Sequence, residues 1–186
     1  MKKNVLLVIV LLAFIGQSNV WAQEKGQIRA GLGLTMGTES AISDTGESKL
    51  GFGIVIGGDY FVTDAISIAP SYSFFFKSSV DAGGGQEVSI KASSFDIDGK
   101  YYFVKSGVNI YGLAGLSFGF AKATATIDFG AGPTEISVSE NQVGFNLGAG
   151  LDYYLSDKVY LNGQVKYTIS GLEQLAINLG VGFNLN

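Results

Sequence analysis

The side chains that most often perform catalysis are missing from this chain, which contains no histidine and no cysteine. This composition excludes Ser-His-Asp and Cys-His nucleophiles and removes the commonest ligands of zinc. Carboxylates remain, and Asp96, Asp98 and Asp152 are the candidates for acid–base chemistry or for binding a cation. Asp96-Ile97-Asp98-Gly99 starts like a calcium loop, but it has no downstream glutamate and falls in a strand-like segment. We therefore expect no enzymatic activity, metal or cofactor, and expect these acids to pair with basic residues.

Alternating hydrophobicity indicates which elements hold these residues. In residues 174–186, every second side chain from Leu175 to Leu185 is large and apolar, and the residues between them are Ala, Asn or Gly. This period of two fits a β-strand and not a helix. The chain is therefore expected to form about eight strands of the length that a tilted membrane-spanning strand needs. The same alternation recurs in 158–170, 143–154 and 91–103, and more loosely in 27–36, 50–62, 65–77 and 108–121.

Short and long connections alternate between these strands. Three are tight turns that follow aromatic residues, at 62–65, 104–108 and 155–158. The other connections are more polar and mostly longer, at about 38–49, 78–90, 122–141 and 170–174. Tight turns at one end, longer loops at the other and an aromatic boundary are typical of outer-membrane barrels. We predict an all-β fold: a closed antiparallel up-and-down transmembrane β-barrel of about eight strands, with short periplasmic turns and longer extracellular loops.

The polarity of the two strand faces favours a membrane barrel over a soluble one. Large apolar side chains occupy one face of most strands, and Gly, Asn, Ser and a few charges occupy the other. An eight-stranded barrel has a narrow interior that small polar side chains suit, whereas lipid outside suits large apolar ones. Charged residues of inward parity are expected to neutralise each other in a filled lumen, and they number four acids and three bases: Arg29, Asp59, Asp96, Asp98, Lys100, Asp152 and Lys166.

The N-terminus has the pattern of a cleavable secretion signal. Lys2 and Lys3 precede an apolar run, and Val20-Trp21-Ala22 fits a signal-peptidase site. We predict a signal peptide at residues 1–22 and one barrel domain at residues 23–186. Loss of two lysines with the signal would leave ten basic and sixteen acidic residues, a net charge of −6. This acidic balance argues against nucleic acid as a partner.

The sequence resembles the OmpX/OmpA-type family of small outer-membrane β-barrel domains over nearly all of residues 23–186. The resemblance lies in stretches such as 148–154 before a tight turn, and in the last strand. That strand resembles the signal read by the barrel-insertion machinery, through Asn178, Gly180, Phe183 and Leu185, although Asn186 follows where the family often ends on an aromatic residue. The resemblance implies a barrel in the bacterial outer membrane, with membrane lipid and the insertion machinery as partners.

Three functions are compatible with such a barrel. The first is a structural or surface-interaction role, in which the loops bind an unknown extracellular ligand. The second is a narrow channel, which the small lumen disfavours. The third is a soluble lipocalin-like carrier, which would need the opposite face polarity. Within 122–141, Thr124, Thr126, Ile136 and Val138 favour a strand hairpin above the membrane, whose edge would be free to pair with a partner strand. A solvated loop with no specific ligand is equally compatible with this segment.

Overall fold

The computed structural model describes residues 24–42, 48–83, 86–128, 133–170 and 173–186. The predicted signal peptide, residues 1–22, lies outside the described residues. Within the described ranges no helix has the length and apolar character needed to cross a membrane. Nine strands occupy them: β1 (Ile28–Ile42), β2 (Ser48–Phe61), β3 (Ile66–Phe75), β4 (Ser78–Gly83), β5 (Gln86–Ser106), β6 (Val108–Asp128), β7 (Pro133–Tyr154), β8 (Val159–Ile169) and β9 (Gln174–Asn184).

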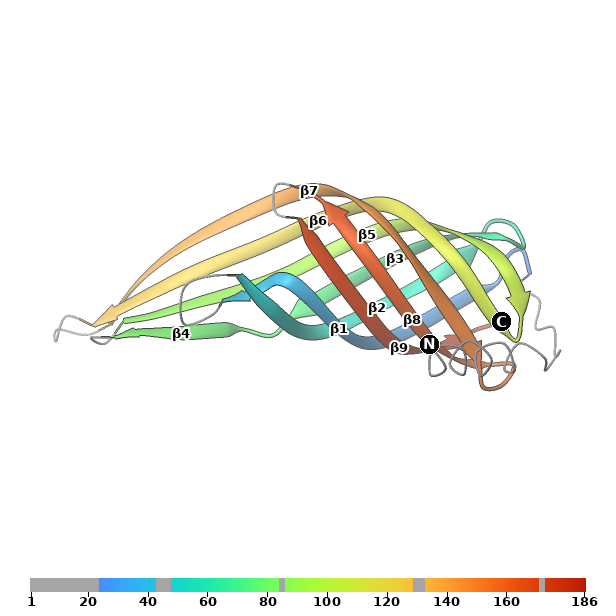
Figure 1. Cartoon of the computed structure of the whole chain (residues 1–186), viewed down its shortest axis with the longest axis horizontal. Helices are drawn as coiled ribbons and strands as arrows, with labels where there is room; N and C mark the ends of the chain where they lie inside the picture. The colour runs from blue at the N-terminus through green and yellow to red at the C-terminus, as the bar shows by residue number, and fades with distance from the viewer. Residues whose placement is uncertain (1–23, 43–47, 84–85, 129–132, 171–172) are drawn as a thin grey trace, which may run out of the picture.

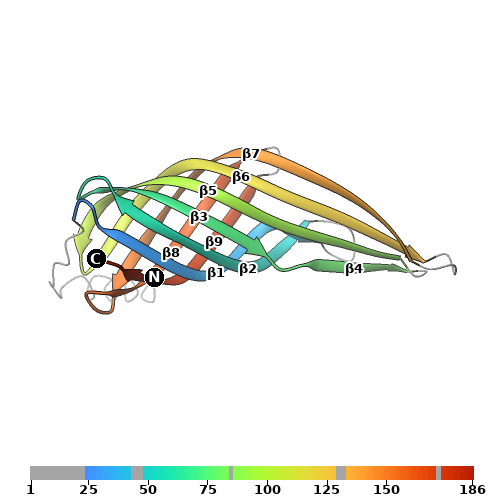
Figure 2. The same ribbon diagram turned by 180° about the vertical axis from the view of Figure 1, so that it is seen from behind.

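Eight of these strands close into a ring (Figures 1 and 2). Consecutive strands pair antiparallel, β1 pairs with β9, and β3 pairs with β5, so the sheet returns to its start. The short strand β4 follows β3 and pairs with β5 farther along the same edge. The predicted closed antiparallel barrel of about eight strands is therefore confirmed, with β4 as an addition that the sequence did not predict.

Side chains alternate between the two faces of the ring as the sequence predicts. Asn146 and Asn178 point into the barrel and are 0% and 6% exposed, whereas Leu147 and Leu179 point outward and are 46% and 57% exposed. A soluble carrier would reverse this arrangement, because it must put apolar side chains inside and polar ones in water. The structure thus has the polarity of a barrel surrounded by lipid.

Two inward tyrosines pack directly over glycines on the neighbouring strand. Tyr160 pairs with Gly182, and Tyr111 pairs with Gly150. A Cβ atom built on Gly182 would lie 2.0 Å from the ring of Tyr160, and one on Gly150 would lie 2.4 Å from the ring of Tyr111. Glycine is therefore required at these two positions because each ring occupies the space of the missing side chain.

The three tight turns lie where the sequence predicts them, at one end of the barrel. The Thr63 hydroxyl accepts hydrogen bonds from two backbone N–H groups of its turn, and the Ser156 hydroxyl does the same in the β7–β8 turn. The β5–β6 connection is the single residue Gly107, whose φ of 74° is in the left-handed region that glycine adopts without strain. The C-terminus lies at this same end (Figure 1).

At the opposite end, most of the predicted loops are strands. Strands β5, β6 and β7 are 21, 21 and 22 residues long, about twice what a tilted membrane span needs. Figure 1 shows their ends and β4 extending well beyond the other strands. The loop predictions at 78–90 and 122–141 are therefore corrected, although the β6–β7 hairpin was anticipated within 122–141. The segments have polar side chains because water surrounds them, and a polar strand in water is easily mistaken for a loop.

Candidate functional site

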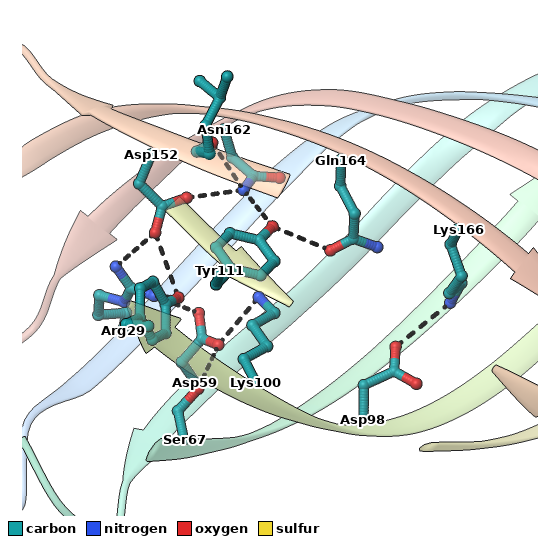
Figure 3. A network of polar contacts seen from close by, with 12 residues as sticks. Arg29, Asp59, Ser67, Asp98, Lys100, Tyr111, Asp152, Asn162, Gln164 and Lys166 are labelled. Atoms are coloured by element: carbon teal, nitrogen blue, oxygen red, sulfur yellow. Dashed lines mark hydrogen bonds and ion pairs between the residues drawn. The ribbon is translucent and has the colours of Figure 1, made fainter. Parts of the chain in front are cut away.

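Arg29 is the centre of a buried ionic cluster (Figure 3). It pairs across the strands with Asp59, close to the end of β2 at Phe61, so the cluster lies in the half of the barrel nearest the tight turns. Its guanidinium makes ion pairs of 2.9 Å with Asp59 and of 2.9 Å with Asp152. It also donates hydrogen bonds to the hydroxyls of Tyr102 and Tyr154. Arg29 is 1% exposed and Asp152 is 0% exposed, so the pairs replace water as partners of these charges.

Aromatic rings surround the Arg29 guanidinium. Its central carbon lies 4.7 Å from the ring centroid of Phe61, 4.6 Å from that of Tyr160 and 5.4 Å from that of Tyr102. These distances allow cation–π attraction, which strengthens where water is excluded. Sequence reasoning missed this aromatic group, although Phe61, Tyr102 and Tyr160 share the inward parity of the charged residues and that parity could have identified them.

Lys100 extends the same cluster toward the middle of the lumen. Its ammonium lies 2.9 Å from Asp59 and 4.9 Å from the ring centroid of Tyr111. Asn162 donates hydrogen bonds of 2.8 Å to the Tyr111 hydroxyl and 2.7 Å to Asp152. Two bases and two acids therefore balance in the turn-proximal cluster, our name for Arg29, Asp59, Lys100 and Asp152.

The other three predicted charges form a second cluster, separate from the first. The Lys166 ammonium lies 2.8 Å from Asp96 and 3.5 Å from Asp98. The Asn146 side-chain amide donates to both acids, at 3.2 Å and 2.8 Å, and accepts a hydrogen bond from Thr168. Within the described ranges, no group of three or more acidic side chains is arranged to hold a metal ion. The seven predicted residues thus all lie in the lumen, in two groups.

The lumen is filled at the level of Arg29. Arg29, Phe61, Tyr102, Tyr111 and Asp152 are each at most 2% exposed, so no water-wide passage touches them. One cavity of about 80 Å³ lies beside the clusters, and the residues that line it include Asp59, Asp98, Lys100, Asn162 and Asn178. A second, of about 90 Å³, is lined by residues nearer the far end, including Phe75, Ser94 and Gln142. The interior is a polar core with small cavities.

The four residues of the predicted insertion signal lie along β9 and just beyond it. Asn178 points into the barrel, whereas Phe183 and Leu185 point outward and are 43% and 63% exposed. Gly180 pairs with Gly33 of β1, on the seam where the first and last strands close the ring. Their role in insertion stays a prediction.

Beyond the barrel, β5, β6 and β7 form a four-stranded sheet with β4. We call it the projecting sheet and define it by residues 78–83, 86–92, 121–128 and 133–141. Along β7, every side chain that points outward from Val143 to Leu151 is apolar. Beyond Val143, toward the tip of the sheet, the outward residues are polar: Asn141, Ser139 and Ser137. The apolar residues Val138 and Ile136 point the other way, on the face continuous with the lumen.

The same reversal occurs along β5 and β6, and β4 has the polarity of the strand it pairs with. The lumen-side face of the projecting sheet, which we call the inner face, contains two apolar rows formed by direct cross-strand partners. Ile136 and Val138 on this face are 58% and 68% exposed. The opposite outer face is polar. The inner rows are Val80–Val88–Ala125–Ile136 and Ile90–Ala123–Val138, and the outer face includes Glu87, Lys91, Lys122, Thr124, Thr126, Glu135, Ser137 and Ser139.

One long edge of the projecting sheet is open. Strand β7 pairs with β8 from Phe145 to Tyr154. Between Thr134 and Asn141, β7 pairs with β6 on one side, and no described strand pairs with its other side. An open edge presents backbone N–H and C=O groups to the surroundings and can accept a further strand.

These features define an integral membrane β-barrel with a filled lumen and a sheet standing outside the membrane. The chain belongs to the family of outer membrane protein beta-barrel domains, whose model matches residues 7–184. It is therefore a protein of the bacterial outer membrane. Barrels of this kind have short periplasmic turns and longer extracellular segments, and this general rule assigns the tight turns to the periplasm and the projecting sheet to the outside of the cell.

Individual relatives are distant. Outer membrane protein PagN of Salmonella typhimurium is 23% identical in an alignment of 155 residues that covers 75% of this chain and 65% of PagN, a little under two thirds of its length. Ail, the attachment invasion locus protein of Yersinia pestis, has a similar structure, with a TM-score of 0.60, 18% identity and coverage of 87% of this chain and 99% of Ail. The N-terminal barrel domain of Pseudomonas aeruginosa OprF has a TM-score of 0.55 at 21% identity, over 88% of this chain and 100% of that domain. These structural similarities establish the shared fold.

Proposed function

We propose that this protein is a non-enzymatic surface-interaction protein whose projecting sheet binds an extended extracellular polypeptide. The observation that carries the proposal is the reversed polarity of that sheet. Ile136 and Val138 gain nothing from lipid at this height, yet they remain more than half exposed on a face that lies beside an open strand edge. A strand added to β7 would complete its backbone hydrogen bonds and cover part of the inner apolar face.

One of the similar structures contains a bound ligand. Ail has also been solved with the heparin analogue sucrose octasulfate, at 18% identity and a TM-score of 0.63 to this chain. In our chain the outer residues Glu87 and Glu135 carry negative charge near the tip of the sheet. This charge and the apolar inner face favour a polypeptide over a sulfated sugar as the ligand of the projecting sheet.

The test uses the full-length protein in nanodiscs and a fluorescent peptide that copies residues 134–141, which has the alternation an added strand needs. Peptide binding is measured by anisotropy for the native protein and for the double variant Ile136→Asp/Val138→Asp. The matched control is Ser137→Asp/Ser139→Asp, which adds the same charge to the opposite face of the same strand. We expect the inner-face variant to weaken binding at least tenfold and the control to change it by less than threefold. Equal binding by both variants, or no binding to the native protein, would contradict the proposal.

The role proposed for the lumen is structural. The seven lumen charges are proposed to hold the barrel strands together and to close the interior to ions. In planar bilayers we expect small, irregular currents at most, because Arg29 and its neighbours leave no continuous passage. Large, stable, ion-selective current steps would favour the narrow channel instead.

Export and assembly complete the proposal. We infer that residues 1–22 are removed during secretion, so that the mature chain begins at Gln23, and that Asn178, Gly180, Phe183 and Leu185 contribute to recognition by the insertion machinery. N-terminal sequencing of the protein from the outer-membrane fraction tests the cleavage site. A Phe183→Ala/Leu185→Ala variant tests the signal, and undiminished insertion of that variant would remove it from the proposal.

A further inference from the structure

Two lysines face each other directly on the outer face of the projecting sheet. Lys91 of β5 and Lys122 of β6 are cross-strand partners, and both side chains are exposed. Such partners have Cβ atoms about 5 Å apart, and like charges at that position destabilise a sheet. In the part of the chain that the structure describes, neither lysine makes an ion pair. The position therefore calls for an anion from outside the chain.

The lysine pair lies immediately above the apolar band of the barrel. Phe120, two residues before Lys122 on the same face, is 43% exposed, and Phe95 and Phe118 stack below it with ring centroids 6.4 Å apart. Asn141, the β7 partner of Phe120, begins the polar part of that strand. The apolar band thus ends at the level of Phe120.

Strand geometry places the ammonium groups among lipid headgroups. Two residues of strand advance about 7 Å, and the headgroup layer occupies about 5–7 Å on each side of the hydrocarbon core. The aliphatic stem of a lysine can lie along apolar surface while its ammonium reaches the polar layer. Lys91 and Lys122 are therefore at the depth of lipid phosphates.

The charges on the outer face are also ordered by height. Glu87 and Glu135 flank Thr126 on the two neighbouring strands, and Thr126 is four residues farther from the membrane than Lys122. Glu87 already pairs with Lys77 at 3.1 Å. The bases thus lie next to the membrane and the acids lie away from it. A soluble polyanion lying along this face would meet both signs, whereas a lipid phosphate would meet the bases alone.

We propose that Lys91 and Lys122 together bind the phosphate group of an outer-leaflet lipid. One phosphate has enough acceptor oxygens for two ammonium groups, and its charge removes the repulsion between them. Binding would also fix the base of the projecting sheet against the membrane surface. This inference does not depend on the polypeptide ligand proposed above, because that ligand would occupy the opposite face and the β7 edge.

The experiment titrates the full-length protein in a zwitterionic detergent with phosphatidic acid, whose headgroup is a phosphate monoester, and counts bound lipid by native mass spectrometry. The test variant is Lys91→Gln/Lys122→Gln. The matched control is Lys25→Gln/Lys158→Gln, which removes the same charge from two exposed lysines at the periplasmic end. A surface lysine contributes about fivefold to binding an anionic lipid, so we expect about 25-fold weaker binding for the test variant and less than twofold change for the control.

A second arm separates a lipid phosphate from a soluble anion. Sucrose octasulfate is added as a competitor, and we expect it to change phosphatidic acid binding by less than twofold. Equal affinities of the test and control variants would overturn the proposal. The proposal would also be overturned if the two lysines were needed to bind sucrose octasulfate but not to bind phosphatidic acid. All variants are first checked for the heat-modifiable mobility of a folded barrel, and the exposed position of the four lysines predicts that each folds.

Discussion

The barrel and the projecting sheet are made from the same strands, β5, β6 and β7, yet they present opposite faces to their surroundings. In the barrel, Leu147 points outward and Asn146 inward, whereas in the projecting sheet Ser137 points outward and Val138 inward. The pairing of β6 with β7 has no register shift in either part, and the one shift in the pairing of β5 with β6, between Tyr102 and Val104, lies near the tight turn. The surroundings therefore select the polarity of each face: lipid selects apolar residues outside the barrel, and water selects polar ones above it.

The comparison extends to ion pairs. The Arg29 pairs in the lumen are buried, with side chains at most 5% exposed, whereas the pair between Lys77, just before β4, and Glu87 of the projecting sheet is about half exposed. Water can replace a lost partner on the sheet, but it has little access to the lumen. Similar ion-pair distances should therefore have very different effects on stability.

The largest effect is expected for Arg29→Met. The change leaves Asp59 and Asp152 without their shared guanidinium, and an unpaired buried charge costs about 3–5 kcal/mol. The measurement is the free energy of unfolding of the liposome-embedded barrel in urea. Lys77→Met is the control, and because its pair is half exposed we expect a loss of at most about 1 kcal/mol. Similar losses for the two variants would mean that the lumen is hydrated around Arg29.

The next effect tests where the membrane ends along β7. Leu147→Arg places a charge on the lipid face. Near the midplane this should make insertion into the membrane less favourable by about 2–4 kcal/mol. Val138→Arg, on the same strand but in the projecting sheet, should change the free energy of insertion by less than about 0.5 kcal/mol, because surface substitutions away from special features have small effects. Folding yield into vesicles, followed by the gel mobility shift, gives both values. A severe defect in Val138→Arg would place the projecting sheet in contact with lipid.

The sequence predicts the barrel well because the alternation of apolar and polar residues identifies each strand independently of the others. Alternation in 174–186 identifies both faces of β9 without knowledge of any other strand. Parity likewise places the seven lumen charges inside. The partners within the lumen could not be predicted, because Lys166 on β8 meets Asp96 and Asp98 on β5, and these strands are separated by two others in the sheet. Such contacts depend on how the closed ring brings opposite walls together.

The projecting sheet shows a second limit of sequence reasoning. The alternation of β6 and β7 continues above the membrane, but polar residues there occupy the outward parity, so the segment 122–141 has the composition of a loop. Ile136 and Val138 indicated β-structure, yet their parity relative to Leu147 was the informative signal. Counting parity across the whole of β7 would have predicted both the long strand and the reversed face.

The smallest effect on stability is expected when either of two inward glycines is replaced by alanine. One of them lies inside the barrel and the other at the base of the projecting sheet. Gly182→Ala puts a Cβ atom 2.0 Å from the ring of Tyr160, which is held against Arg29 and has little room to move. Overpacking of this kind costs about 1–3 kcal/mol. The Cβ atom that Gly119→Ala adds would lie 3.8 Å from its nearest neighbour, the Gln142 carbonyl oxygen, which is an ordinary contact distance.

Because alanine restricts the unfolded chain more than glycine does, Gly119→Ala should be neutral or stabilise the barrel by about 0.5 kcal/mol. Urea unfolding in liposomes measures both variants, and the two changes should have opposite signs. Tyr160→Phe in the Gly182→Ala background keeps the ring and should not restore stability, whereas Tyr160→Ala should relieve the clash while losing the cation–π contact. If Gly182→Ala were as stable as Gly119→Ala, the Tyr160 ring would be free to move away, and the aromatic group around Arg29 would be less rigid than its distances indicate.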